Sequence, residues 1–248
     1  MDLTLLIAAH GYDLEEEIGI VRSLLARKID GVVVVGFEHS DIAMRMLNTQ
    51  SVPVLSIWNY QIMSALPCIG CDNVAAGEMA AQAILDMGHT DIALLFPPID
   101  VNDRAADRRQ GALETLSKAH IQTSPQWVHD CPYDLGYAKR IAIEILSAPQ
   151  RPSAFLCGND VIAHGVMLAA QALSINIPQQ LSVVGIGDFR GSAEFEPGLS
   201  TVRFPARRIG IAAADRISKA SYGTWEPESC QLIPHRWVER GSLAVFTH

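Results

Sequence analysis

The chain has 248 residues, of which 49% are hydrophobic and 19% charged, and its formal net charge is −8. This acidic balance argues against bulk nucleic-acid binding by the polypeptide, because a surface that follows phosphates is basic. No apolar run approaches the ~20 residues that span a bilayer, and the start lacks the basic region of a signal peptide. The five cysteines are odd in number and lie mostly in apolar segments, which favours a reducing cytoplasm.

Short apolar runs alternate with helical patterns along the whole chain. The pattern predicts strands at residues 3–9, 31–36, 54–57, 92–96, 127–129, 154–157, 181–186 and 199–203. It predicts helices at residues 14–27, 40–49, 75–87, 104–119, 133–146, 161–173 and 205–220, and an extended edge segment at 232–238. Repeated βα units with continuous apolar strands indicate an α/β fold, with parallel sheets covered by helices on both faces.

Polar residues follow the apolar strand at residues 154–157. Asn159 and Asp160 stand where that strand gives way to a helix, and either side chain suits a helix N-cap. The carboxyl ends of strands in open α/β sheets are also where ligands bind. One of the two side chains can therefore cap while its neighbour faces a ligand, and the alternative is that both only cap.

Two motifs resemble cofactor sites only weakly. Cys68 and Cys71 form a CxxC. A zinc site would need a second pair of ligands at a suitable spacing, which the sequence lacks, and a redox motif would need a helix that starts directly at the cysteines. We therefore favour the interpretation that both are buried strand cysteines. Residues 185–191 form a glycine-rich loop, but Pro197 comes too soon for a dinucleotide motif, so we favour a loop that exposes Asp188. No metal site, cofactor or catalytic residue is predicted, and His89 and His164 are interpreted as structural.

Three further residues suit a carbohydrate. Trp58 and Asn59 end a predicted strand, where the ring can stack on C–H faces and the amide can bind hydroxyls. Packing of Trp58 between lobes is the alternative. Arg108, near the start of a predicted helix, offers forked donors to hydroxyls or a carboxylate. The alternative interpretation of Arg108 is a surface ion pair with a nearby aspartate.

Several segments, in their order and spacing, resemble the effector-binding core of the LacI/GalR family of bacterial transcription regulators. The likeness runs from about Leu3 to the C-terminus. Its motifs are Asp72-Asn73 with Ala76, MGHTDIALL, Arg108-x-x-Gly111, PSAFLCGNDVIAHGVMLA, IPQQLSVVGIGDF and PGLSTVRFPARRIG. Trp58-Asn59 and the Gly-Asp-Phe loop at 187–189 are similar to the gluconate-repressor branch.

The resemblance implies two Rossmann-like lobes of the periplasmic-binding-protein type, joined by three crossovers, with a ligand cleft between them. The expected lobes are 1–71 with 203–229, and 72–202 with 230–248, with crossovers near Cys71-Asp72, Val202-Arg203 and Ser229-Cys230. The family's ligand contacts carry over to Arg108 and Asn159. Gly187 replaces the usual first acid, so the resemblance implies either that Asp188 reaches the ligand from the neighbouring position or that this contact is absent. The implied effector is a sugar or sugar acid.

Two parts of the family pattern are missing. The helix-turn-helix and hinge helix are absent, so operator DNA is expected to be bound only through a head domain upstream. The first strand and helix of the N-terminal lobe are also absent, and residues 3–9 align with the family's second strand. The resemblance implies a cytoplasmic, non-enzymatic homodimer. Exposed apolar faces on residues 40–49 and 205–220 are its expected interface. The alternatives are a stand-alone sugar-binding or transport protein and, more distantly, an α/β enzyme.

Overall fold

The computed structural model describes residues 4–220 and 229–246, and these form two compact units. Unit 1 consists of Met1–Gly70, Val101–Asp103 and Ala206–Ile233, and unit 2 of Cys71–Asp100, Arg104–Pro205 and Pro234–His248. The chain leaves unit 1 after Gly70, contributes Val101–Asp103 to it, and returns at Ala206; the breaks at Gly70 and Ala206 lie near the first two expected crossovers. The last passage lies after Ile233 rather than at Ser229-Cys230, because the strand that starts at Cys230 pairs within unit 1.

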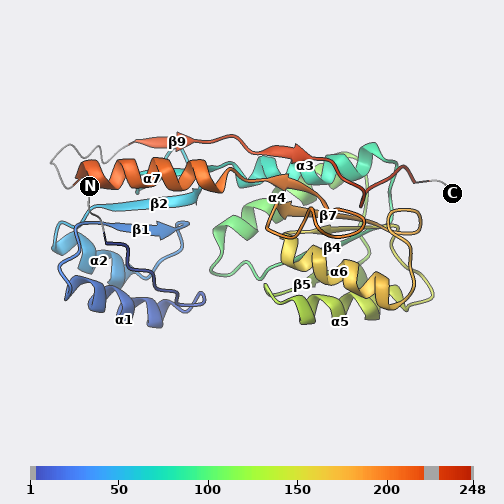
Figure 1. The fold of residues 1–248 in the computed structure, drawn as a ribbon, viewed down its shortest axis with the longest axis horizontal. Helices are drawn as coiled ribbons and strands as arrows, with labels where there is room; N and C mark the ends of the chain where they lie inside the picture. The colour runs from blue at the N-terminus through green and yellow to red at the C-terminus, as the bar shows by residue number, and fades with distance from the viewer. Residues whose placement is uncertain (1–3, 221–228, 247–248) are drawn as a thin grey trace. The chain divides into compact units, whose positions relative to one another are not determined.

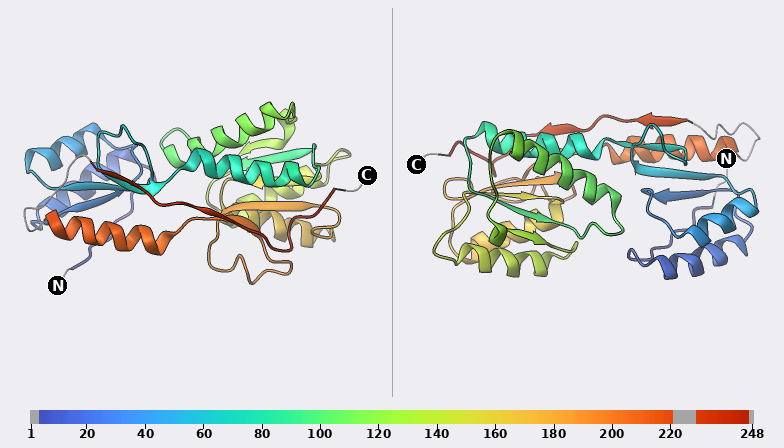
Figure 2. Two further views of the ribbon diagram at one scale, coloured as in Figure 1. Left: turned by 90° about the horizontal axis from the view of Figure 1, so that it is seen from above. Right: turned by 180° about the vertical axis from the view of Figure 1, so that it is seen from behind.

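Unit 1 is a parallel sheet with helices on both faces (Figure 1). Its strands lie in the order β1-β2-β3-β9, with helices α1 and α2 on one face and α7 on the other (Figures 1 and 2). Its elements are α1 (Leu14–Leu25), β1 (Val32–Val35), α2 (Asp41–Thr49), β2 (Val54–Asn59), β3 (Cys68–Cys71), α7 (Ala206–Ala220) and β9 (Cys230–Leu232). Asp13 starts α1 by accepting hydrogen bonds from two amides of the first turn, and Ile18, Val21 and Leu25 then pack on the sheet.

The strand predicted at residues 3–9 is wrong for the part that the structure describes. Residues 4–9 form no strand, and Leu5 and Ile7 are 80% and 85% exposed. An extended segment becomes a strand only when a neighbour satisfies its backbone groups, and no described strand pairs with this one. The edge strand β1 likewise leaves Val33 and Val35 exposed.

Unit 2 contains a larger sheet with strand order β10-β8-β7-β6-β4-β5. Helices α5 and α6 pack side by side on one face, and α3 and α4 lie on the other (Figures 1 and 2). Its elements are α3 (Asn73–Asp86), β4 (Ile92–Phe96), α4 (Asp103–Lys118), β5 (Val128–Asp130), α5 (Leu135–Leu146), β6 (Ala154–Cys157), α6 (Asp160–Ala172), β7 (Ser182–Gly187), β8 (Ser200–Arg203) and β10 (Arg236–Val238). The strands β4, β6 and β7 are buried throughout, as expected of parallel strands covered on both faces.

Helices α3 and α4 approach each other closely through two glycines. A Cβ atom on Gly77 would lie 2.0 Å from the Arg108 carbonyl oxygen, and one on Gly111 would lie 2.0 Å from the Val74 carbonyl oxygen. Only glycine permits so close an approach of two helix backbones. This contact fixes the turn of α4 that carries Arg108.

The interpretation of the CxxC as buried strand cysteines is confirmed, because Cys68 and Cys71 lie in β3 and are fully buried. The structural interpretation of His89 also agrees with the structure. Its Nδ1 atom lies 2.9 Å from the Ser153 hydroxyl, and its Nε2 atom contacts Ser182 and the Ala244 carbonyl. Among the described residues, no helix is long and apolar enough to cross a membrane.

Candidate functional site

Arg108 lies on α4 with only 7% of its surface exposed, and three segments of unit 2 hold its guanidinium group. Nη1 is 3.4 Å from Asn73 Oδ1 at the start of α3, and Nη2 is 3.3 Å from the Tyr133 hydroxyl. The Phe204 ring lies 6.0 Å from the guanidinium carbon, within cation–π range. Arg108 is therefore a buried arginine, whereas its neighbour Arg109 forms an exposed ion pair with Asp130.

Asn159 and Asp160, which follow β6, have different structural roles. Asn159 is the N-cap of α6, because its Oδ1 atom accepts a 2.6 Å hydrogen bond from the Val161 amide. Asp160 does not cap. It is fully buried, and its carboxylate binds the segments that follow β7. Neither expectation therefore holds for Asp160, which neither caps the helix nor faces a ligand.

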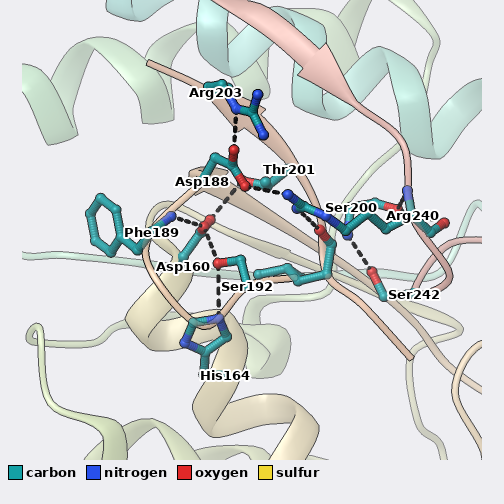
Figure 3. A network of polar contacts seen from close by, with 11 residues as sticks. Asp160, His164, Asp188, Phe189, Ser192, Ser200, Thr201, Arg203, Arg240 and Ser242 are labelled. Atoms are coloured by element: carbon teal, nitrogen blue, oxygen red, sulfur yellow. Dashed lines mark hydrogen bonds and ion pairs between the residues drawn. The ribbon is translucent and has the colours of Figure 1, made fainter. Parts of the chain in front are cut away.

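The carboxylate of Asp160 is the centre of the network drawn in Figure 3. Oδ1 accepts a hydrogen bond from the Thr201 hydroxyl at 2.6 Å, and Oδ2 accepts from the Phe189 amide at 2.9 Å and the Ser192 hydroxyl at 2.7 Å. A Cβ atom at Gly185 would lie 2.4 Å from Oδ1, so glycine in β7 is what admits this carboxylate. The network fixes the loop that presents Asp188.

His164 adds an imidazole ring to this network. Its Nε2 atom lies 3.1 Å from the Ser192 hydroxyl, which itself donates to Asp160 (Figure 3). Burial lowers the pKa of His164, although the Asp160 charge acts in the opposite direction. The ring also stacks on Phe195 at 4.5 Å between centroids, so His164 is packed, as the sequence predicts.

Asp188 is engaged by two arginines within unit 2 (Figure 3). Oδ1 accepts a 2.6 Å hydrogen bond from Arg240 Nη2, and Oδ2 pairs with Arg203 Nε. Burial opposes ionisation of Asp188, but the hydrogen bonds from Arg240 and Arg203 outweigh it and lower its pKa. Its φ angle of 56° follows Gly187 at 142°, so the backbone is turned at this strand end.

The predicted residues of unit 1 lie at the carboxyl end of β2. Trp58 has a φ angle of 76°, a strained conformation for a bulky side chain that costs about 1–2 kcal/mol and is typical of functional positions. Asn59 is 1% exposed; its Oδ1 accepts from the Tyr60 amide, and its Nδ2 donates to Asp103 at 2.9 Å. Asp103 also accepts from the Phe37 amide at 3.1 Å.

Apart from Arg108, which lies on α4, the predicted residues of each unit lie at or just after strand carboxyl ends. In unit 2 the parallel strands β6, β7 and β8 bring Asn159, Asp188 and Arg203 to one edge of the sheet. No local pattern indicates the partners that orient these side chains, because the partners come from distant segments. Those partners are Asn73, Tyr133, Arg203, Phe204 and Arg240 in unit 2 and Asp103 in unit 1.

These arrangements suit binding of a polar organic molecule. A guanidinium group fixed by its neighbours donates in a forked geometry to hydroxyls or a carboxylate. The aromatic groups beside it, Tyr133 and Phe204, offer surfaces to apolar ring faces. No group of three or more potential metal ligands occurs within the described ranges. The fold and these strand ends define the class of two-lobed α/β ligand-binding proteins.

Comparisons with known proteins identify the family. The model of the periplasmic binding protein-like domain matches residues 81–243. Over 243 residues the chain is 25% identical to the HTH-type transcriptional repressor PurR of Klebsiella pneumoniae, covering 97% of this chain and 71% of that protein. The chain belongs to the periplasmic binding protein-like domain family, as the effector-binding domain of a LacI-type transcription regulator.

Solved structures agree with this assignment. The transcription regulator GntR from Chromobacterium violaceum has a TM-score of 0.89 at 26% identity, covering 96% of this chain and 88% of that one. A LacI family regulator from Enterococcus faecium with bound ribose has a TM-score of 0.84 at 20% identity, covering 99% and 88%. The second likeness supports the fold alone. The relatives are transcription regulators, so the expectation of a non-enzymatic sensor is confirmed.

Proposed function

We propose that this chain senses a small sugar or sugar acid and that Arg108 is the principal group that binds it. The supporting observation is the guanidinium itself, which is 7% exposed and already oriented by Asn73, Tyr133 and Phe204. A guanidinium ordered before binding loses little side-chain entropy when the effector arrives. Its forked donors match vicinal hydroxyls or a carboxylate.

The other predicted contacts differ in how much of their hydrogen-bonding capacity the protein uses. Asn159 uses Oδ1 for its cap, so its amide N–H groups are the part proposed for the effector. Asn59 bonds to Asp103 and Tyr60, which favours a role in orienting the strained Trp58 backbone. Asp188 is already paired with two arginines, so its proposed contact with the effector requires lone pairs that Arg203 and Arg240 do not use.

The experiment is a thermal-shift screen of the purified chain against neutral sugars, sugar acids, phosphorylated sugars and nucleobases. A ligand at a hundred times its dissociation constant stabilises the native state by about 2.7 kcal/mol. We expect one sugar or sugar acid to raise the melting temperature, and Arg108→Ala to abolish that shift. The matched control is Arg109→Ala, which removes a neighbouring arginine whose ion pair with Asp130 is exposed.

Two outcomes would contradict the proposal. One is a cooperative melt that no sugar or sugar acid shifts, and the other is an equal shift in the wild type and Arg108→Ala. A shift given only by a nucleobase would keep the sensor but reject the effector class.

The regulatory part of the proposal concerns DNA. We propose that the effector controls a helix-turn-helix head upstream and that the protein acts as a homodimer. An effector changes DNA affinity only through its different affinities for the two states of the regulator. Operator binding by a protein that carries the head should therefore change by at least about fivefold with effector. A monomer by light scattering at micromolar concentration would contradict the dimer.

A further inference from the structure

Two cysteines of unit 1 face each other across neighbouring strands. Strand β3 pairs in parallel with β9, and Cys68 is the direct register partner of Cys230. Register partners point to the same face of a sheet, and neighbouring strands lie about 4.8 Å apart. The interaction between the two thiols also contributes to a raised pKa of Cys68, as expected of neighbouring side chains.

The two thiols differ in accessibility. Cys68 is fully buried and donates to the Gln61 carbonyl at 3.7 Å, whereas Cys230 is only partly buried and donates to the Leu66 carbonyl at 3.9 Å. Burial raises the pKa of Cys68 to about 12, with a smaller effect from Cys230, although the positive charge of Arg216 acts in the opposite direction. Cys230 is therefore the thiol that a solution oxidant reaches first.

We propose that Cys68 and Cys230 are a reversible disulfide site, oxidised by small-molecule disulfides such as oxidised glutathione. Paired strands place the two Cα atoms within the separation that a disulfide requires, about 4.4–6.8 Å. Both thiols are free in this structure. The neighbouring Cys71, three residues along β3, points to the opposite face of the sheet from Cys68 and is excluded from the pair.

The reaction proceeds by two exchanges. The Cys230 thiolate attacks one sulfur of the small disulfide, forming a mixed disulfide and releasing one small thiolate, which takes up a proton. Cys68 then loses its proton, and its sulfur attacks Cys230 Sγ and expels the second small thiol. Two protein thiols are oxidised and one small disulfide is reduced to two thiols. The high pKa of Cys68 makes the second exchange faster at higher pH.

The bond would join the two strands that lead out of unit 1. Strand β3 (Cys68–Cys71) contains Gly70, where the first segment of unit 1 ends, and β9 ends at Leu232, one residue before Ile233. Gly70 is the register partner of Leu232. Oxidation would fix the three-residue edge strand β9 onto β3 and close the loop between residues 68 and 230. A loop of this length constrains the unfolded chain strongly, so oxidation should raise the melting temperature by about 5–10 °C.

The test is incubation of the full chain with oxidised glutathione at pH 8, followed by alkylation of remaining thiols and mass spectrometry. Before alkylation we expect an intact mass lower by two hydrogen atoms, and a dithiol reductant should reverse this change. Trypsin should yield residues 46–104 linked to residues 220–236. Because the first peptide also contains Cys71, the digest is repeated in Cys71→Ser, where the link must persist.

The matched variants are Cys68→Ser and Cys230→Ser. Cys230→Ser should take up no glutathione, whereas Cys68→Ser should stop at the mixed disulfide. If either variant fails to fold, the mapping in the wild type and Cys71→Ser still decides. The proposal is overturned if the chain stays fully reduced, stops at a mixed disulfide in the wild type, or links another pair such as Cys131 and Cys157.

Discussion

At the scale of single residues, the structure distinguishes side chains that are ready for a ligand from side chains that the protein already uses. Arg108 is oriented by an amide, a phenol and an aromatic ring. Asp188 instead forms ion pairs with Arg203 and Arg240. These arrangements lead to different outcomes when each residue is replaced.

Asp188→Asn should weaken folding much more than it weakens effector binding. The substitution leaves Arg203 and Arg240 without their carboxylate, which we expect to cost about 2 kcal/mol in the free energy of unfolding, measured in urea. Because the folded pKa is depressed, the stability from Asp188 is present above its unfolded pKa and is lost as pH falls through the folded value. A large fall in affinity with unchanged stability would show instead that Asp188 is chiefly a ligand contact.

His89 also makes the free energy of unfolding depend on pH, but through burial rather than through ion pairs. Burial lowers its pKa, although the Ala244 carbonyl bond acts in the opposite direction. The unfolded chain therefore binds a proton near pH 6.5, where the folded protein resists it. The free energy of unfolding should fall as pH decreases below about 6.5, by at most about 1.4 kcal/mol per pH unit for this group. Unfolding from pH 5 to 8 should show a smaller slope in His89→Gln; equal slopes would contradict this assignment.

At the scale of elements, the contact between α3 and α4 sets the position of Arg108. In Gly77→Ala the new methyl group would overlap the Arg108 carbonyl oxygen at 2.0 Å, so the helices must separate. We expect a loss of about 1–3 kcal/mol in the free energy of unfolding and weaker effector binding in the folded fraction. Urea unfolding and calorimetry measure the two effects.

The matched control is Gly19→Ala on the exposed face of α1. A Cβ atom there meets nothing within 4 Å, so the substitution should stabilise the protein by about 0.5–1 kcal/mol. Equal effects of the two substitutions would show that helix propensity, rather than the approach of α3 and α4, determines the outcome at Gly77.

Local patterns predicted elements well where one short segment contains all the information. The strands at residues 92–96 and 154–157 are found with their predicted bounds, and the helix predicted at 161–173 is found at Asp160–Ala172, one residue earlier at each end. The pattern failed at residues 4–9, since a strand needs a partner that apolar alternation does not reveal. The predicted edge segment at 232–238 is divided between β9 and β10 for a similar reason, because its two ends pair with different sheets.

The candidate site was predictable only in its principal residues. Arg108 and Asn159 stand in motifs that a sequence displays. Their surroundings depend on contacts between residues far apart in the chain, such as Tyr133 with Arg108 or Arg240 with Asp188. No periodicity or spacing encodes such a pairing, so the ion pairs that engage Asp188 could not be anticipated.

At the scale of the whole molecule, the two units have separate cores of different extent. The sheet of unit 1 has a partly exposed edge strand, β1, whereas β4, β6 and β7 of unit 2 are buried on both faces. We predict that unit 1 opens first. In hydrogen-exchange mass spectrometry without effector, β1 and β2 should exchange before β6 and β7. A single cooperative rate for all four strands would contradict this prediction.

The proposed function requires the Arg108 guanidinium to bind the effector through its forked donors. The most direct measurement is calorimetric titration of the effector found by screening into the wild type, Arg108→Lys and Arg109→Lys. Lysine keeps the charge but loses the fork, so Arg108→Lys should weaken binding by about 10–100-fold. Arg109→Lys, which alters only an exposed pair, should bind like the wild type. Equal affinity in all three proteins would contradict the claim.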